Sequence, residues 1–347
     1  MRSGIAAALL AALLFGVTTP LAKQLLMGSQ PLLIAGLLYL GSGIGLSALI
    51  LLSERGRFAL RLPRKDHPWL AAAVAFGGVL GPALLMFGLS RADAATASLL
   101  LNLEAAFTAL IAWVVFQEAT GPRVVFGFVL IFLGSITLFW PATIARTQDV
   151  AALAVIVGAC LCWAIDNNLT RRVSGGDARA IAAVKGLAAG ATNVGLAFAL
   201  RSTLPQAAHL WFALALGFLG YGVSLVLFIV ALRSLGTART GAYFATAPFI
   251  GGAVAILMYG DALGWPFWIA AALMAAGVWL HLTERHDHEH FHEPVLHTHA
   301  HTHDAHHQHE HDAGWDGSEP HVHLHRHAPM RHRHPHFPDL HHRHTHR

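Results

Sequence analysis

Long apolar stretches, separated by short polar segments, make up most of this chain. A helix needs about 20 mostly apolar residues to cross a bilayer. Ten stretches meet that length, at residues 3–26, 32–52, 68–89, 94–116, 121–140, 149–170, 178–200, 207–232, 237–259 and 264–282. Turn-forming pairs such as Gly121-Pro122 separate them, as is typical of helix ends. The pattern predicts an all-α polytopic membrane protein with ten transmembrane helices.

Composition points to the same class of protein. The 347 residues are 55% hydrophobic and 12% charged, whereas a soluble domain carries about 25% charged residues. The Lys and Arg residues of the apolar body fall in short loops, so we expect the lipid bilayer rather than nucleic acid as a partner. Within the spans there is neither an H-E-x-x-H nor a G-x-S-x-G motif, so we do not expect an enzyme.

Histidine divides the chain into two parts of different chemistry. Of the 26 histidines, 24 lie from His281 to the C-terminus, many of them in His-x-His alternation. Apolar residues are too few there to build a core, so disorder is predicted for 283–347. Neutral imidazole binds Zn, Ni and Co, and we expect such divalent ions on this tail. The candidate ligands are His286, His288, His290, His292, His297, His299, His301, His303, His321, His323, His325 and His327.

Three roles for the tail stay open. It could buffer or sense divalent metals. It could respond to pH, because imidazole titrates near neutrality. It could also have no role at all. None of the three makes a cofactor necessary for the apolar body.

The distribution of Lys and Arg among the loops predicts the orientation. With the N-terminus inside, the inner loops and terminus hold 12 Lys and Arg residues and the outer loops hold 4. Positive charge is enriched on the cytoplasmic side of membrane proteins. Both termini are therefore predicted to be cytoplasmic, in an inner or plasma membrane.

The two halves of the body repeat each other. A shift of 143 residues places Leu89 on Leu232 and Gly121 on Gly264. Two five-helix repeats follow, at 1–145 and 146–282, ahead of the tail at 283–347. Because five is odd, the second repeat must be inverted in the membrane. Inverted repeats around a central site are the architecture of many secondary transporters.

Two matching runs carry a resemblance to a known family. The runs at 103–118 and 247–261 resemble the signature of the EamA-type members of the drug/metabolite transporter superfamily, and the resemblance covers roughly residues 3–282. It implies ten helices in two repeats and gradient-coupled movement of small metabolites, often amino acids or drugs. The first run has Ala105 where the signature has proline, while the second keeps Pro248. Helix 4 is therefore expected to be kinked less than helix 9.

Glu104 is the first candidate for the chemistry. A charge inside a span costs roughly 2.5–3.5 kcal/mol on insertion scales and is a functional candidate by default. Glu104 lies near the middle of the fourth span. It could bind a substrate amine or carry a coupling proton, because burial disfavours the charged form of a carboxyl group. It could also be a structural, protonated glutamate that bonds to neighbouring helices.

Polar residues interrupt the first and sixth spans at corresponding places. They are Asp166, Asn167 and Asn168 in the sixth span, and Thr18, Thr19 and Pro20 in the first. Three consecutive residues cover most of a helical turn, so at least one should face a cavity. Paired interruptions of this kind indicate a transport site. Asp166 could instead lie at the interface and pair with Arg171 or Arg172.

Lys185 is the only lysine in the apolar part of a span, about two turns into the seventh. It could bind a substrate carboxylate or neutralise Asp166 or Glu104. It could equally extend its amine to the cytoplasmic headgroups.

Together these features predict a secondary transporter of a small amino-acid-like or drug-like metabolite. It would work by alternating access with proton coupling, through a cavity lined mainly by helices 1, 4, 6, 7 and 9. The alternative is a divalent metal exporter, or a metal-regulated carrier, with the tail as a buffer. A metal pathway should place His, Asp or Cys ligands inside the bundle. The spans contain only His209, near an outer loop, and His281, at the last helix end, so we favour the metabolite.

Overall fold

The computed structural model describes residues 2–53, 63–116, 121–140, 149–174, 177–260, 263–283, 287–292, 296–301, 321–326 and 330–335. These residues form two compact units, a large helical one and a small one that holds four strands. The helices of both sequence repeats pack into the one helical unit.

Ten apolar helical spans lie within the described residues, as the sequence predicted. Nine are at least 18 residues long and the tenth, α7, has 17. The elements of the first repeat are α1 (Arg2–Leu26), α2 (Pro31–Ser53), η1 (Arg64–Asp66), α3 (His67–Ala73), η2 (Val74–Leu80), α4 (Gly81–Arg91), α5 (Ala94–Leu100), α6 (Asn102–Val114) and α7 (Pro122–Leu138). Those of the second are α9 (Val150–Val173), α10 (Ala178–Ala199), α11 (Ala207–Gly217), η3 (Phe218–Val223), α12 (Ser224–Phe244), α13 (Ala247–Tyr259) and α14 (Trp265–Leu282).

The largest difference from the predicted boundaries is in the eighth and ninth spans. The sequence predicted a connection at 233–236, but α12 continues through it to Phe244. This connection contains no proline, and a single glycine lowers helix stability without ending a helix.

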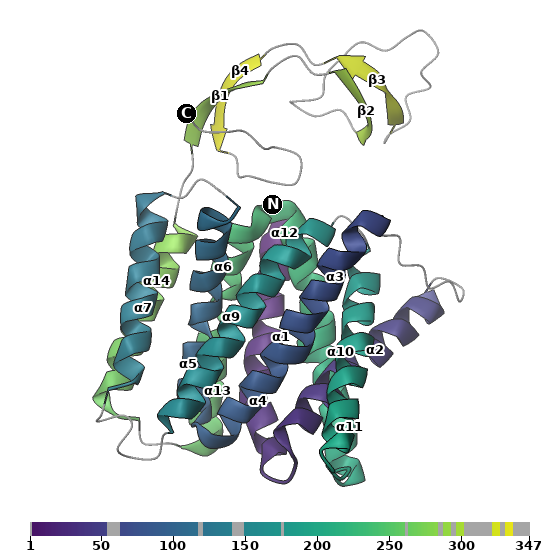
Figure 1. The fold of residues 1–347 in the computed structure, drawn as a ribbon. Coiled ribbons are helices and arrows are strands. Elements are labelled where there is room, and N and C mark those ends of the chain that lie inside the picture. The colour runs from purple at the N-terminus through teal and green to yellow at the C-terminus, as the bar shows by residue number, and fades with distance from the viewer. Residues whose placement is uncertain are drawn as a thin grey trace. The chain divides into compact units, whose positions relative to one another are not determined.

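The two repeats interlock in a symmetric way. α2 of the first repeat lies along α10 of the second, and α7 lies along α14 (Figure 1). α1 packs against α12 and α13, while its counterpart α9 packs against α4 and α6. Each repeat therefore contributes equivalent helices to equivalent contacts, as related halves should.

Small residues bring the backbones of α2 and α10 together. Gly43 and Gly186 lie so close that a methyl group on either would collide with the backbone of the partner helix. Gly190, one turn after Gly186, lies in the same way against Leu40. Close packing of this kind joins helices where lipid removes the hydrophobic drive between them.

Two π-helical segments lie one repeat apart. η2 widens the third span and η3 widens the eighth, and the shift of 143 places Gly77 of η2 on Gly220 of η3. A π-helical segment inside a helix frequently marks a functional site. The sequence analysis did not predict these segments.

The fourth and ninth spans are both interrupted. The break in the fourth span is at Leu101, between α5 and α6, and the break in the ninth is at 245–246, between α12 and α13. The interruption of helix 4 occurs although position 105 is alanine. Proline at position 105 is therefore not required for an interruption at this place in the fold. The expectation that helix 4 is kinked less than helix 9 stays a prediction.

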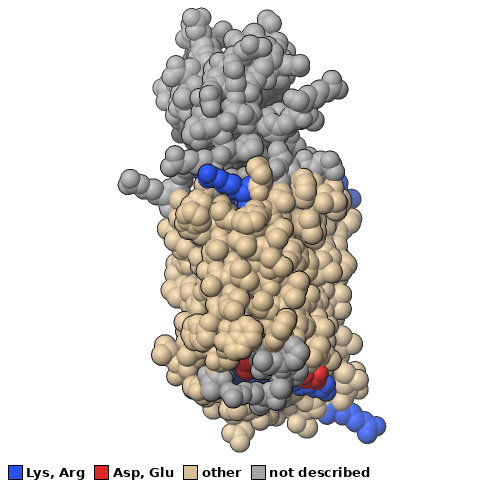
Figure 2. All heavy atoms as spheres, turned by 90° about the vertical axis from the view of Figure 1, so that its left-hand side faces the viewer, with Lys and Arg blue, Asp and Glu red and all other residues tan. Residues whose placement is uncertain are grey.

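On its outer surface, one face of the helical unit is free of charged residues across its middle (Figure 2). On the face drawn in Figure 2, its middle shows neither Lys or Arg nor Asp or Glu, and the charged residues lie near its two ends. Large apolar side chains such as Leu52, Val115 and Leu257 are exposed instead. Because the spans are apolar and helical, their exposed side chains suit lipid, and the protein is a multi-pass membrane protein.

Four short strands form the second unit. β1 (Asp287–His292) pairs with β4 (Met330–Pro335), and β2 (Leu296–His301) pairs with β3 (His321–Arg326), both antiparallel. The prediction of disorder for 283–347 did not anticipate these strands. His-x-His alternation has the two-residue period of a strand, which that prediction left out. A two-stranded pair is at best marginally stable in water, so the strands do not supply the core that the composition lacks.

Candidate functional site

Two adjoining cavities lie inside the helical unit. The larger has a volume of about 450 Å³, counting its open mouth, and the smaller about 320 Å³. Five side chains line both cavities, namely Phe15, Glu104, Asn167, Phe228 and Phe244.

The helices around the cavities differ in part from those predicted. Helices 1, 4, 6 and 9 take part, but among the described residues helix 7 contributes no lining side chain. Helix 2 supplies Tyr39 and helix 8 supplies Tyr221, Ser224 and Phe228. Sequence reasoning missed the role of helix 8. The Gly220-Tyr221-Gly222 run, matched to the glycines of the third span, was the signal that could have shown it.

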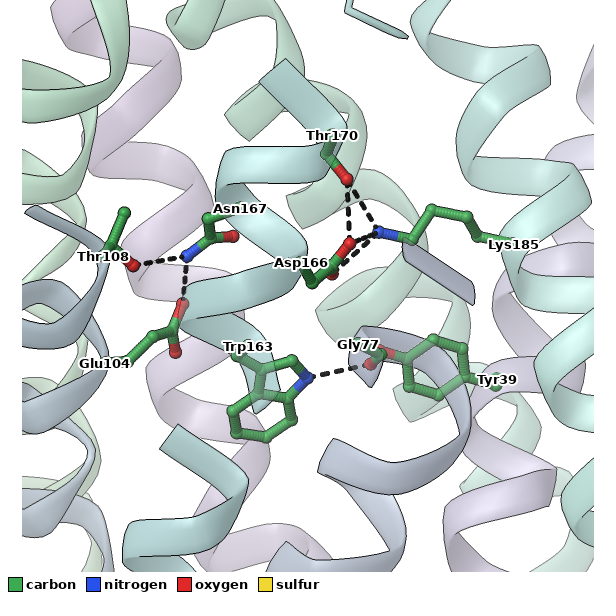
Figure 3. A network of polar contacts seen from close by, with 9 residues as sticks. All are labelled: Tyr39, Gly77, Glu104, Thr108, Trp163, Asp166, Asn167, Thr170 and Lys185. Atoms are coloured by element: carbon green, nitrogen blue, oxygen red, sulfur yellow. Dashed lines mark hydrogen bonds and ion pairs between the residues drawn. The ribbon is translucent and has the colours of Figure 1, made fainter. Parts of the chain in front are cut away.

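Glu104 directs its carboxylate toward both cavities. It is on the first turn of α6, because the break at Leu101 starts a new helix there, and a helix N-terminus favours negative charge. The Asn167 amide donates to Glu104 Oε1 at 2.9 Å and to Thr108 Oγ1 at 3.2 Å (Figure 3). The carboxylate is therefore held by a neutral amide from α9 and lines both cavities.

Asp166 lies one residue before Asn167 but in a different electrostatic setting. Lys185 Nζ lies 2.6 and 2.8 Å from the two Asp166 carboxylate oxygens and 3.1 Å from Thr170 Oγ1. The Thr170 hydroxyl also donates to Asp166 Oδ1 at 2.8 Å. All three side chains are buried. Figure 3 shows this cluster beside the Glu104–Asn167–Thr108 cluster, on the other side of α9.

The sequence left open whether Lys185 reaches the headgroups and whether Asp166 pairs with an arginine at the interface. In the structure these two residues pair with each other. Lys185 is 1% exposed, so its amine does not extend to the headgroups. Arg172 places its guanidinium over the Trp69 ring, 4.7 Å from the ring centre, while Asp166 bonds to Lys185 and Thr170. The charge of Asp166 is compensated inside the protein.

Side chains from three helices donate to the carbonyls of η2. Tyr39 Oη donates to Gly77 O at 2.6 Å, and Trp163 Nε1 donates to the same oxygen at 2.9 Å (Figure 3). Asn193 Nδ2 lies 3.3 Å from both Gly78 O and Val79 O. Buried polar groups of the backbone require partners, and the widened helix obtains them from α2, α9 and α10.

Six aromatic side chains form a continuous wall of the larger cavity. They are Phe15, Tyr39, Trp163, Tyr221, Phe228 and Phe244, and we call them the aromatic wall. Ring centres lie 5.1 Å apart for Tyr39–Tyr221, 5.7 Å for Tyr221–Phe15 and 5.6 Å for Phe15–Trp163. Phe15–Phe244 and Phe244–Phe228 follow at 5.3 and 4.9 Å. Trp163, whose indole also donates to Gly77 O, belongs to it.

The predicted break in the first span is not a break. α1 continues through Pro20, and Thr18 and Thr19 are buried without lining either cavity. The Thr18 hydroxyl bonds back to Leu14 O at 2.7 Å. Pro20 O accepts a bond from Tyr259 Oη at 2.9 Å, so this part of α1 contacts α13. Neighbouring helices can accommodate a proline inside a membrane helix in this way.

The other predicted site residues fall into two groups. Pro248 is the second residue of α13 and lines the smaller cavity. Its missing N–H is not needed at that position of a helix. Asn168 faces away from both cavities and donates to Thr108 O at 3.0 Å and Ala164 O at 2.9 Å. It therefore joins α9 to α6.

The histidines of the tail are described only through their backbone. His286, His303 and His327 lie outside the described residues, as do Glu118 and Asp261, the last residues of the two matching runs at 103–118 and 247–261. The other nine predicted ligands are in the strands, where His297 pairs with His325 and His299 with His323 across β2 and β3. Among the described residues, no group of three or more His, Cys, Asp or Glu side chains could hold a metal ion.

Comparison with known proteins defines the class. The sequence matches the EamA-like transporter family twice, over residues 2–140 and 150–283, one match for each repeat. The chain belongs to the EamA-like transporter family, and it is a membrane transporter.

A relative agrees with this assignment, and a solved structure shares the fold. An uncharacterized transporter of Methanothermobacter thermautotrophicus is 27% identical over 286 residues, which cover 78% of this chain and 83% of the relative. A protein of known crystal structure has the same fold, with a TM-score of 0.63 and 19% identity, over 81% of this chain and 98% of the other.

Proposed function

We propose that this transporter is a proton-coupled secondary carrier of a small organic metabolite, with Glu104 as the group that carries the coupling proton. The observation behind the proposal is the contrast between two neighbouring acids. Lys185 compensates Asp166, whereas the Glu104 carboxylate contacts Asn167 and the cavities. Glu104 is the acid that can exchange a proton or a solute without breaking a buried ion pair.

Asn167 supports this role because it is compatible with both forms of the carboxyl group. Its Nδ2 donates to a charged carboxylate, and the bond to Thr108 Oγ1 keeps the amide in place when Glu104 becomes neutral. Breaking a buried ion pair, by contrast, costs about 3–5 kcal/mol. A cycle that protonates Glu104 therefore needs less rearrangement than one that protonates Asp166.

Transport under an imposed pH gradient tests the proposal. Liposomes that contain the full chain are placed in a defined metabolite mixture, and mass spectrometry identifies the solutes that the gradient moves across the membrane. Wild-type protein should move at least one solute in a gradient-dependent way. Glu104→Gln, which keeps the shape but cannot ionise, should abolish the dependence on the gradient.

Two further variants make the result specific. Glu104→Asp keeps a carboxyl group and should retain gradient-driven transport at a lower rate. Asp66→Asn removes an acid that lines neither cavity and should behave like wild type. If Glu104→Gln moves the solute with unchanged pH dependence, the coupling role is wrong.

We also propose that the protein lies in an inner or plasma membrane with both termini in the cytoplasm. The excess of Lys and Arg on one set of loops supports this orientation. Reporter fusions at the two ends of the chain, active only on one side of the membrane, check it. Activity of both reporters on the outer side would overturn it.

A second proposal concerns the tail, which we expect to bind Zn, Ni or Co without being required for transport. The His-x-His alternation supports it, since imidazole suits these ions. Calorimetric titration of the full chain with each ion should show several weak sites, and a chain ending after Thr283 should lose them. Equal binding by the shortened chain would place the sites elsewhere. Unchanged transport would make the tail's metal binding separate from the carrier.

A further inference from the structure

The charges around the cavities are unequal. Among the described residues that line them, the ionisable acids are Glu104 and Asp166, and none is Lys, Arg or His. Lys185 lies behind Asp166 and bonds to both its oxygens, so this pair adds no net charge. A deprotonated Glu104 leaves the cavity with one uncompensated negative charge, which only a cation can neutralise.

The wall facing that charge is aromatic. Half of the twelve residues that line the larger cavity belong to the aromatic wall, and their ring contacts are continuous. Aromatic faces attract cations within about 6 Å of the ring centre, and the attraction increases when water is excluded. They also provide apolar surface for a ring or an alkyl chain. The carboxylate thus favours a cationic group at one end of a ligand, and the rings favour an apolar body at the other end.

We propose that the substrate is a monovalent organic cation: a protonated or quaternary amine on an aromatic or other apolar body. The amine binds at Glu104 and the body lies against the aromatic wall. This inference rests on the proposed function, since it takes the cavity as the transport site and Glu104 as its exchangeable group. A proton and the ammonium group compete for the same carboxylate, so loading one releases the other.

Other ligand classes fit the cavity less well. An organic anion would find no cationic side chain among the described lining residues and would be repelled by Glu104. A hard divalent metal ion prefers six or more oxygen ligands, but the free carboxylate here is accompanied by one amide and by rings. Because the site has a single free charge, it suits a single positive charge.

Binding of four related probes to the full chain in detergent tests the proposal without a gradient. The probes share a phenyl ring: 2-phenylethylammonium, 2-phenylethanol, 3-phenylpropionate and phenylalanine. At pH 8, calorimetry should show the ammonium binding at least about tenfold more tightly than each of the others. At pH 6 the affinity for ammonium should fall while that for the alcohol stays constant. Equal or tighter binding of the anion or of phenylalanine would overturn the proposal.

Variants of the protein identify the residues that bind the ammonium probe. In Glu104→Gln, the affinity for the ammonium should fall by at least about tenfold, to that of the alcohol, as expected when a buried charge loses its partner. Phe228→Leu should weaken ammonium binding by about threefold and alcohol binding less. Asp66→Asn is the matched control and should bind all four probes as wild type does. Unchanged ammonium affinity in Glu104→Gln would contradict the assignment.

The outcomes separate this inference from the proposed function. If the ammonium shows no preference but Glu104→Gln abolishes gradient-driven transport of some other solute, only the substrate class is wrong. If the ammonium binds selectively through Glu104 but transport ignores the pH gradient, the site is right and the coupling is wrong. Should Glu104→Gln fail to fold, the selectivity of the wild-type protein among the four probes still decides the matter.

Discussion

The π-helical segments η2 and η3 occupy equivalent places in the two repeats but have different surroundings. Donors from α2, α9 and α10 bond to the carbonyls of η2, and the buried Asp166–Lys185 pair lies directly against Gly77. η3 contacts Thr18 of α1 through Gly220 and directs Tyr221 into the larger cavity. The same local geometry thus supports a hydrogen-bonded segment in one half and a cavity-lining segment in the other.

This difference indicates that equivalent segments of the two repeats can differ in how firmly they are held. Fixed polar bonds give η2 one well-defined position. η3 is held mainly by ring and van der Waals contacts, which tolerate small shifts better than hydrogen bonds, whose strength falls steeply with angle. We expect η3 to move more than η2 when a solute binds. Substitutions in and next to η2 and η3 test this expectation.

The largest effect is expected from Lys185→Met. It leaves Asp166 buried without its cation, and breaking such a pair costs about 3–5 kcal/mol. The yield of monodisperse protein and its unfolding temperature in detergent should fall sharply. The double variant Lys185→Met with Asp166→Asn should recover most of the loss, and Lys65→Met, at an exposed lysine, should have no effect. No recovery in the double variant would argue against the pair as the cause.

The next effect compares the matched glycines directly. A methyl group at Gly77 would overlap the Asp166 carboxylate, which Lys185 and Thr170 hold in place. Gly77→Ala should therefore cost about 1–3 kcal/mol, as overpacking does. Gly220→Ala should cost less, because the added methyl group would lie 2.9 Å from Thr18 Cβ, whereas a methyl group at Gly77 would lie 2.5 Å from Asp166 Cβ.

Thermal unfolding of the two variants, with Gly195→Ala as control, measures this difference. Gly195 has open space around it, and alanine there should be neutral or slightly stabilising. A larger loss for Gly220→Ala than for Gly77→Ala would mean that η3, and not η2, is the fixed segment.

A smaller effect is expected from Asn193→Leu. It removes the donor shared by Gly78 O and Val79 O, at a cost of about 1–3 kcal/mol for buried groups left without a partner, with water able to recover part of it. Hydrogen exchange should become faster in η2 but not in η3. Thr192→Val, one residue earlier and exposed, is the control. Equal changes in both segments would show that η2 gains nothing specific from Asn193.

The smallest effect is expected from ending the chain after Thr283. The family match ends at this residue, and all contacts discussed for η2 and η3 lie before it. The unfolding temperature of the helical unit should stay within experimental error of wild type. A decrease of several degrees would show that the tail stabilises the helices.

Much of the architecture could be predicted because it follows from the lipid that surrounds the spans. In lipid every backbone group must bond internally, so apolar length alone defines the spans, and matched glycines define the repeats. The sequence also identified the polar candidates within the spans, because a polar group there is costly unless it has a function or a bonding partner. These candidates are Glu104, Asp166, Asn167 and Lys185. The tail strands and the continuous α12 were missed where local propensity is weak and competing patterns coexist.

The sequence by itself determined that this protein crosses the membrane with ten helices in two related halves, because hydrophobicity and repeat spacing are properties of the chain. Which of the two acids, Glu104 or Asp166, is paired with Lys185 depends on the tertiary structure. Asp166 and Asn167 are adjacent in sequence, but successive helical residues point about 100° apart, one toward Lys185 and the other toward Glu104. The sequence also could not show that six rings from five spans meet in one wall, because contacts between distant helices depend on how the two repeats interlock.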